Sequence, residues 1–163
     1  MSVFNEVIAA HEKAKAEQAT QEEKQRTMAI EKDAAFRRYF DEMVQGLLLP
    51  EGTKFVQDAE AYGFPSEINA KPDGKGNPYF SISVVPKKGV PPSPFGYSNA
   101  DKAVFSLQGL VDEKVVLVAS YYDQRVENGV QKHRCAIGDI TPDWLNTQLK
   151  EFLSRALRAR NGN

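Results

Sequence analysis

The sequence has only one cysteine, Cys135, in 163 residues, so it cannot form an internal disulfide. Its first thirty residues lack both the basic start and the continuous apolar stretch of a secretory signal. No apolar run approaches the roughly 20 residues that cross a bilayer, the longest being the stretch from Val115 to Ala119. These absences predict a cytoplasmic protein with no membrane-spanning segment.

An excess of charge of one sign is also missing. The chain has 21 Lys and Arg against 22 Asp and Glu, for a formal net charge of −1. Only the last 23 residues, 141–163, are basic, with 4 basic and 2 acidic side chains. An even balance gives no general attraction for a phosphate backbone, although a local patch can still form on folding. Nucleic acid is therefore an alternative partner, with Arg155, Arg158 and Arg160 as the candidate contacts.

Proline is absent from Ser2 to Leu48, and Gly46 is the only glycine in that stretch. Alanine, glutamate, lysine, glutamine and arginine dominate it, and these residues have high helix propensity. The pattern predicts one long helix, with at most one break. The whole chain has 41% hydrophobic and 10% aromatic residues, which is enough to build one globular core.

The second half of the long helix has an apolar stripe at helical spacing. We expect this half to pack on the core. The stripe consists of Phe36, Tyr39, Phe40, Met43, Val44 and Leu47.

The first half of the helix has a smaller apolar patch, Phe4, Val7 and Ile8, and then becomes polar. Residues 1–27 are therefore interpreted as a polar helical extension, and residues 28–163 as a single domain. A lone helix cannot bury such a patch by itself. The extension either frays, folds back as a hairpin, or docks the patch onto a second copy or another protein.

Pro50 and Gly52 are predicted to end the long helix, because proline lacks an amide hydrogen and disfavours helix in the residue before it. Four or more strands follow, and Val115–Tyr122, apolar on both faces, is expected to be interior. Asn128-Gly129 is typical of a hairpin turn, and Lys71–Asn77 of a turn between strands. The expected strands are Lys54–Tyr62, Tyr79–Val85, Ala103–Leu107, Val115–Tyr122 and Val130–Ile137.

A C-terminal helix begins at a clear signal, with Thr141 as the cap and Pro142 at the first position. One face is apolar and is expected to pack on the sheet, through Trp144, Leu145, Leu149, Phe152, Leu153, Ala156 and Leu157. The predicted fold class is therefore α+β: a long N-terminal helix, a mostly antiparallel meander of 4–6 strands, and an amphipathic C-terminal helix on the sheet.

The connection Pro86–Asp101 is longer than most loops in compact domains and is rich in proline. Proline reduces the backbone entropy that is lost on binding, and exposed aromatic side chains make good anchors. The candidate partner-binding residues are Pro91, Pro92, Pro94, Phe95 and Tyr97. In the alternative interpretation the loop is a rigid connection, and Phe95 and Tyr97 fold back over the sheet edge.

No motif assigns a metal, cofactor or catalytic residue. His133 and Cys135 lie two apart on a predicted strand, but the only other histidine is His11 on the distant helix. A structural zinc site usually needs four Cys or His ligands at tight spacing. We therefore interpret Cys135 as a core residue and His133 as an edge residue.

The sequence thus favours a noncatalytic protein-interaction or adaptor protein. It would self-associate, or dock, through its N-terminal helix and present a proline-rich loop. Homodimerisation or a protein partner is expected, and neither a cofactor nor enzymatic activity is. The alternatives are a nucleic-acid-associated protein using the basic C-terminal helix, and a small hydrolase or nuclease using scattered carboxylates.

Overall fold

The computed structural model describes residues 2–98, 100–122 and 129–161, and all their side chains except those of residues 160 and 161. Close contacts divide the chain into two units, Met1–Phe36 and Arg37–Asn163. The elements are α1 (Val3–Met43), the π-helical turn η1 (Val44–Leu48), α2 (Leu49–Ala61), β1 (Ser66–Asn69), β2 (Tyr79–Val84), β3 (Ala103–Leu110), β4 (Val115–Tyr121), β5 (Val130–Cys135), the 3-10 turn η2 (Ile137–Asp139) and α3 (Pro142–Asn161).

The five strands form one antiparallel sheet in the order β1-β2-β3-β4-β5, so each strand pairs with its neighbour in the chain. This arrangement confirms the predicted α+β class and the meander. It also confirms that β4 is interior, since β4 pairs on both sides. The predicted turn at Asn128-Gly129 falls partly on Asn128, which lies outside the described residues.

The turn between β1 and β2 is organised by Asp73. Its carboxylate accepts hydrogen bonds from the backbone N–H groups of Lys75, at 2.8 Å, and Asn77, at 2.9 Å, and from the side chain of Gln108. These bonds, the Asn77 amide foremost, favour the ionised form and hold the pKa of Asp73 below its ordinary value. The predicted turn over Lys71–Asn77 is therefore confirmed, as a side-chain-stabilised turn.

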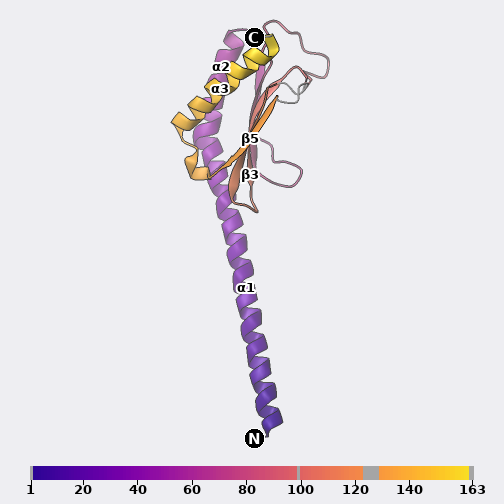
Figure 1. Cartoon of the computed structure of the whole chain (residues 1–163), viewed down its shortest axis with the longest axis vertical. Coiled ribbons are helices and arrows are strands. Elements are labelled where there is room, and N and C mark those ends of the chain that lie inside the picture. Colours follow the sequence, from indigo (N-terminus) through magenta and orange to yellow (C-terminus); the bar gives the residue numbers. More distant parts are fainter. Residues whose placement is uncertain (1, 99, 123–128, 162–163) are drawn as a thin grey trace. The chain divides into compact units, whose positions relative to one another are not determined.

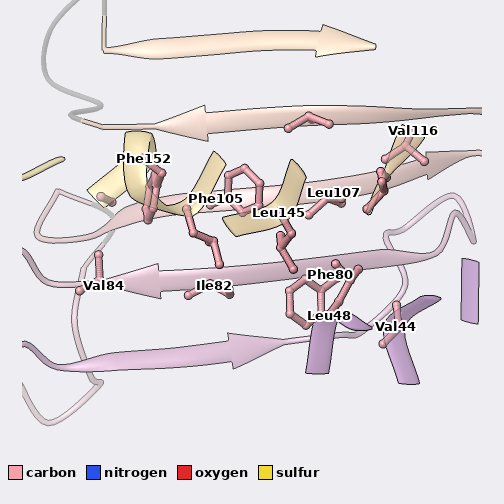
Figure 2. Packing of buried hydrophobic residues seen from close by; sticks show 14 of the residues in the cluster. Val44, Leu48, Phe80, Ile82, Val84, Phe105, Leu107, Val116, Leu145 and Phe152 are labelled. Carbon is pink, nitrogen blue, oxygen red and sulfur yellow. The ribbon is translucent and has the colours of Figure 1, made fainter. Parts of the chain in front are cut away.

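Helices α2 and α3 lie on the same face of the sheet (Figure 1). Figure 2 shows Phe152 and Leu145 of α3 on the strand face that carries Phe105. The rings of Phe152 and Phe105 are 5.8 Å apart between centroids, and both side chains are buried. The layer between helices and sheet is therefore the hydrophobic core of the domain.

The prediction that Pro50 and Gly52 end the helix was wrong, and so was the strand predicted over Lys54–Tyr62. The chain remains helical through Pro50 to Ala61 as α2. The π-helical turn η1 comes directly before it, and the N–H of Leu49 bonds to the carbonyl of Val44, five residues back. Pro50 is then the second residue of a restarted α-helix, a position that needs no amide hydrogen.

The π-helical turn also shifts the buried stripe. Leu48 is fully buried, Leu47 is only half-buried, and Tyr39 is 53% exposed, so the stripe predicted through Tyr39 and Leu47 was partly wrong. The buried positions Phe40, Val44 and Leu48 follow steps of four residues. In an α-helix each such step turns about 40° past a full circle, because one turn takes about 3.6 residues. The wider turn at Val44–Leu48 compensates for this drift.

Gly52 has a packing role in α2 and does not end the helix. A Cβ at this position would lie 3.0 Å from Cζ of Phe80, 3.3 Å from Cδ1 of Ile68 and 3.4 Å from Cδ1 of Ile82. The absence of a side chain therefore lets α2 approach β2 closely.

Four residues separate the end of α2 from β1, and they contain a paired-hydrogen-bond motif around a glycine. Gly63 has a φ of +90°, its N–H bonds to the Glu60 carbonyl at 2.9 Å, and the N–H of Phe64 bonds to the Ala59 carbonyl at 2.9 Å. Glycine adopts this left-handed conformation without the penalty that a Cβ brings. Pro65 follows, and the chain then enters β1, a strand that the sequence analysis did not predict.

The start of α3 agrees with its sequence signal. The backbone N–H of Trp144 donates to Oγ1 of Thr141 at 3.2 Å, and Pro142 is the first residue of the helix. Leu145, Leu149, Phe152 and Ala156 are buried, so the predicted apolar face is confirmed.

Candidate interaction surfaces

The loop between β2 and β3 presents Phe95 on a tight turn. The N–H and Oγ of Ser93 both donate to the Gly96 carbonyl, at 3.2 and 2.6 Å, and the N–H of Gly96 donates back to the Ser93 carbonyl at 2.9 Å. Pro94 lies between them and fixes one backbone angle. Phe95, at the apex of this turn, is 99% exposed.

Tyr97 in the same loop behaves differently from Phe95. Its hydroxyl donates to the Val90 carbonyl at 2.6 Å, and the side chain is half-buried. Pro91 and Pro92 lie within the segment that this bond closes, and both are exposed. Tyr97 thus stabilises the loop by a hydrogen bond to Val90, whereas the side chain of Phe95 is exposed to solvent.

The predicted N-terminal patch is exposed on α1. Phe4 is 72% exposed, and Val7 and Ile8 are exposed as well. Every residue from 2 to 32 is exposed, and Met28 and Ile30 add two more apolar side chains. Within the unit Met1–Phe36, therefore, these apolar side chains are in contact with solvent.

The basic candidates of α3 already have partners inside the helix or the domain. Arg155 pairs with Glu151 at 2.8 Å, and its guanidinium lies 5.8 Å from the centre of the Tyr122 ring. Nε of Arg158 donates to the Ser154 carbonyl at 3.5 Å. The side chain of Arg160 lies outside the described residues. These contacts hold Arg155 and Arg158 along the helix.

An apolar pocket of about 190 Å³ lies between α2 and α3, near the end of α2. Tyr62 at its rim is 70% exposed. Phe64 and Ala59 form part of the wall on the α2 side, and Leu153 contributes from α3. The pocket is lined by Phe55, Asp58, Ala59, Tyr62, Phe64 and Leu153.

The root of the proline-rich loop lies beside this pocket. Nζ of Lys88 is 5.9 Å from the centre of the Phe64 ring, and Cγ of Lys88 would be 3.6 Å from a Cβ placed on Gly63. These contacts place the start of the loop, at Lys88, beside the pocket, whereas Tyr97 lies in another hollow with Glu67 and Ser83.

His133 and Cys135 share one face of β5, since they pair with Val118 and Val116 of β4. The His133 ring stands edge-on to Trp144, at 6.5 Å between centroids. Cys135 is half-buried against the core, and burial, with the Asp139 carboxylate adding to it, raises the pKa of its thiol. A raised pKa keeps the thiol protonated and unreactive at neutral pH.

No group of three or more His, Cys, Asp or Glu side chains is placed to hold a metal ion in the part of the chain that the structure describes. Within the same ranges, no helix is long and apolar enough to cross a membrane.

No family model, curated protein or solved structure matches this chain. The candidate surfaces therefore rest on their own geometry.

Sequence reasoning missed the pocket because it assigned four of the lining residues to a strand. These are Phe55, Asp58, Ala59 and Tyr62. With α2 read as a helix, Phe55, Ala59 and Tyr62 recur at spacings of four and three residues, which places them on one face. The signal that would have shown this is Gly63-Phe64-Pro65, a typical helix end one residue after Tyr62.

Proposed function

We propose that this protein is a noncatalytic protein-interaction protein that self-associates through its N-terminal helix and presents the proline-rich loop. The observation that carries the proposal is the continuous exposure of residues 2–32, with Phe4, Val7 and Ile8 among them. An isolated helix in water is only marginally stable, so burial of this patch against another chain would supply stability that the helix lacks alone. A second copy is the partner we propose for the helix.

The loop supports the same proposal through Phe95. Large aromatic side chains are enriched among the residues that dominate binding energy, and a turn closed by Ser93 and Gly96 loses little entropy when it docks. The proposed location is the cytoplasm, because Cys135 is the only cysteine and its thiol is stable in a reducing compartment.

The test is the solution mass of the full chain, measured by light scattering after size exclusion over a concentration series. We expect a dimer for the wild-type chain and a monomer for the double variant Phe4→Asp with Ile8→Asp, because two buried carboxylates would oppose an apolar contact. The domain should keep its melting temperature in the variant.

The matched control is Gln21→Asp with Gln25→Asp. It places the same charges at the same spacing on an exposed part of α1 that lacks the apolar patch. The control should remain dimeric. A wild-type chain that stays monomeric at every concentration would rule out the second copy as the partner of the helix.

A further inference from the structure

Strand β5 is the last strand of the sheet, with β4 on one side and no described strand on the other (Figure 2). Just before β5, the N–H of Tyr122 bonds to the carbonyl of Gly129, its direct partner in the same register, at 2.7 Å. In an antiparallel pair, residues alternate between bonding to the neighbouring strand and directing their N–H and C=O groups away from it. Val130, Lys132 and Arg134 therefore direct their backbone groups to the outer edge.

The opposite edge of the sheet, β1, offers less to a partner. It has four residues, and the same alternation leaves only Ser66 and Ile68 directed outward. Both side chains are half-buried, and Oγ of Ser66 donates to the Val56 carbonyl of α2 at 3.2 Å. Strand β5 has six residues, and those from Gln131 to Arg134 are all exposed. The sheet thus has one short edge that contacts α2 and one longer edge that is open to solvent.

The outward groups of β5 determine the chemistry of a partner that can cover them. N–H and C=O groups that repeat along an exposed strand are matched by the backbone of another extended chain, which adds a strand to the sheet. No proline or bulge interrupts β5, and its register with β4 is continuous from Val130 to Cys135. The edge can therefore accept a strand along its whole length.

The side chains of this edge disfavour a second copy as the added strand. Lys132 and Arg134 lie on the same face of β5, because they are two residues apart. Two β5 strands paired about a two-fold axis would bring these cations beside the same cations of the partner, and like charges on facing strands are destabilising. Arg134 pairs with Glu113 at 3.0 Å, whereas Lys132 lies 5.8 Å from the centre of the Tyr121 ring and pairs with no described carboxylate. An acidic side chain opposite Lys132 would thus form a new ion pair.

The other face of the same edge is partly aromatic. Gln131 and His133 lie on the face of β5 that carries α3, and the His133 ring stands edge-on to the half-buried Trp144. Side chains of an added strand would alternate between the two faces in the same way. Every second side chain would then lie beside His133 and close to Trp144, where an apolar group can pack.

We propose that β5 binds an extended segment of another protein, added antiparallel to the sheet. Its acidic side chains lie opposite Lys132, and its apolar side chains lie on the face of His133 and Trp144. The antiparallel direction continues the pattern of the sheet, in which each of the described pairings is antiparallel. This contact goes beyond the proposed function and does not depend on it, because β5 belongs to the unit Arg37–Asn163 and the proposed helix contact to Met1–Phe36.

The test uses the isotope-labelled full chain and a synthetic peptide of alternating glutamate and valine, followed by nuclear magnetic resonance. In the free chain, the amides of Val130, Lys132 and Arg134 should exchange with solvent faster than those of Gln131 and His133, which bond to β4. The peptide should slow the exchange of the first three amides. Unchanged exchange of these amides at millimolar peptide would overturn the proposal.

Two N-methylated peptides separate strand addition from simple attraction between charges. A glutamate opposite Lys132 in an antiparallel pair directs its own N–H toward β5, whereas the neighbouring valines direct theirs away. Methylation of the glutamate nitrogens should weaken binding at least about tenfold, and methylation of the valine nitrogens should preserve it. Equal affinity of the two peptides contradicts strand addition, because an ionic contact does not depend on which edge of the peptide is methylated.

The variant Lys132→Glu tests the preference for acidic side chains. It should weaken binding of the glutamate peptide at least about threefold, and a peptide with lysine in place of glutamate should bind the variant better than the wild type. The matched control, Lys71→Glu, makes the same change at an exposed lysine after β1 and should leave both affinities unchanged. An equal loss of affinity in the two variants would mean attraction by overall charge and would rule out the contact with Lys132. Melting temperatures of both variants check that the domain is folded.

Discussion

Helix α3 and the first part of α1 are both long helices, but different forces hold them. In α3, Leu145, Leu149, Phe152 and Ala156 are buried against the sheet. In α1, no residue from 2 to 32 is buried, and the helix there rests on the intrinsic propensity of alanine, glutamate, lysine and glutamine. A helix with a buried face shares the stability of its domain, whereas an exposed helix has only its own. The chain therefore has two regions with separate responses to mutation.

We expect the largest loss of unfolding free energy from Phe152→Ala, in the buried face of α3. Phe152 is 1% exposed, and its ring lies near those of Phe105, Tyr122 and Phe55. Truncation of a buried phenylalanine costs about 3–5 kcal/mol of unfolding free energy. Chemical denaturation followed by circular dichroism measures it.

Trp144→Ala is the comparison variant within the same helix. Trp144 is only half-buried at the margin of the core, so its truncation should cost less than that of Phe152. An equal or larger loss for Trp144→Ala would place the centre of the core at the start of α3.

A smaller change in stability is expected from alanine substitutions at two glycines near the junction of α1 and α2, and its sign should differ between them. Gly52→Ala brings a methyl group to 3.0 Å from Cζ of Phe80, whereas a Cβ on Gly46 meets nothing within 4 Å. Overpacking costs about 1–3 kcal/mol, and glycine to alanine in a helix gains up to about 1 kcal/mol. Gly52→Ala should therefore be destabilising and Gly46→Ala neutral or stabilising, as seen in thermal melts. Equal stabilisation by both would show that α2 does not need its close approach to β2.

The smallest effect on the domain is expected from Ala19→Gly in the exposed part of α1. The substitution should lower the helical signal, because glycine costs about 1 kcal/mol in a helix interior, and leave the main unfolding transition in place. Ala156→Gly in α3 is the matched variant, since Ala156 is fully buried and its loss also removes packing. If Ala19→Gly lowered the main transition as much as Ala156→Gly, the separation of the two regions would be wrong.

Much of the sheet could be predicted from sequence because its signals are local. Apolar side chains at every second position predicted β2, and the apolar run from Val115 predicted that β4 is an interior strand. The cap at Thr141 located the start of α3. In each case the residues that carry the signal are the residues that form the element.

Helix α2 could not be predicted in the same way, because Pro50 is a strong local breaker whose effect is cancelled by the turn before it. The π-helical turn has Val44 and Leu48 both buried in the core, and packing between distant segments has no local signature. The same holds for the pocket, which depends on Leu153 of α3 lying beside Phe55 of α2. The exposed patch at Phe4 was visible in the sequence, but its partner is a matter for the proposed experiments.

The π-helical turn also determines how the chain tolerates the gain or loss of residues. A surface loop absorbs a deletion by changing its path, but a helix converts each missing residue into a rotation of about 100°. Loss of one residue from Val44–Leu48 would let α1 and α2 join as an uninterrupted α-helix, with Phe40 and Leu48 about 20° short of two full turns apart, so both would stay on the buried face. This segment should therefore accept the loss of one residue, whereas a deletion elsewhere between Phe40 and Ala59 would rotate one part of the helix against the other.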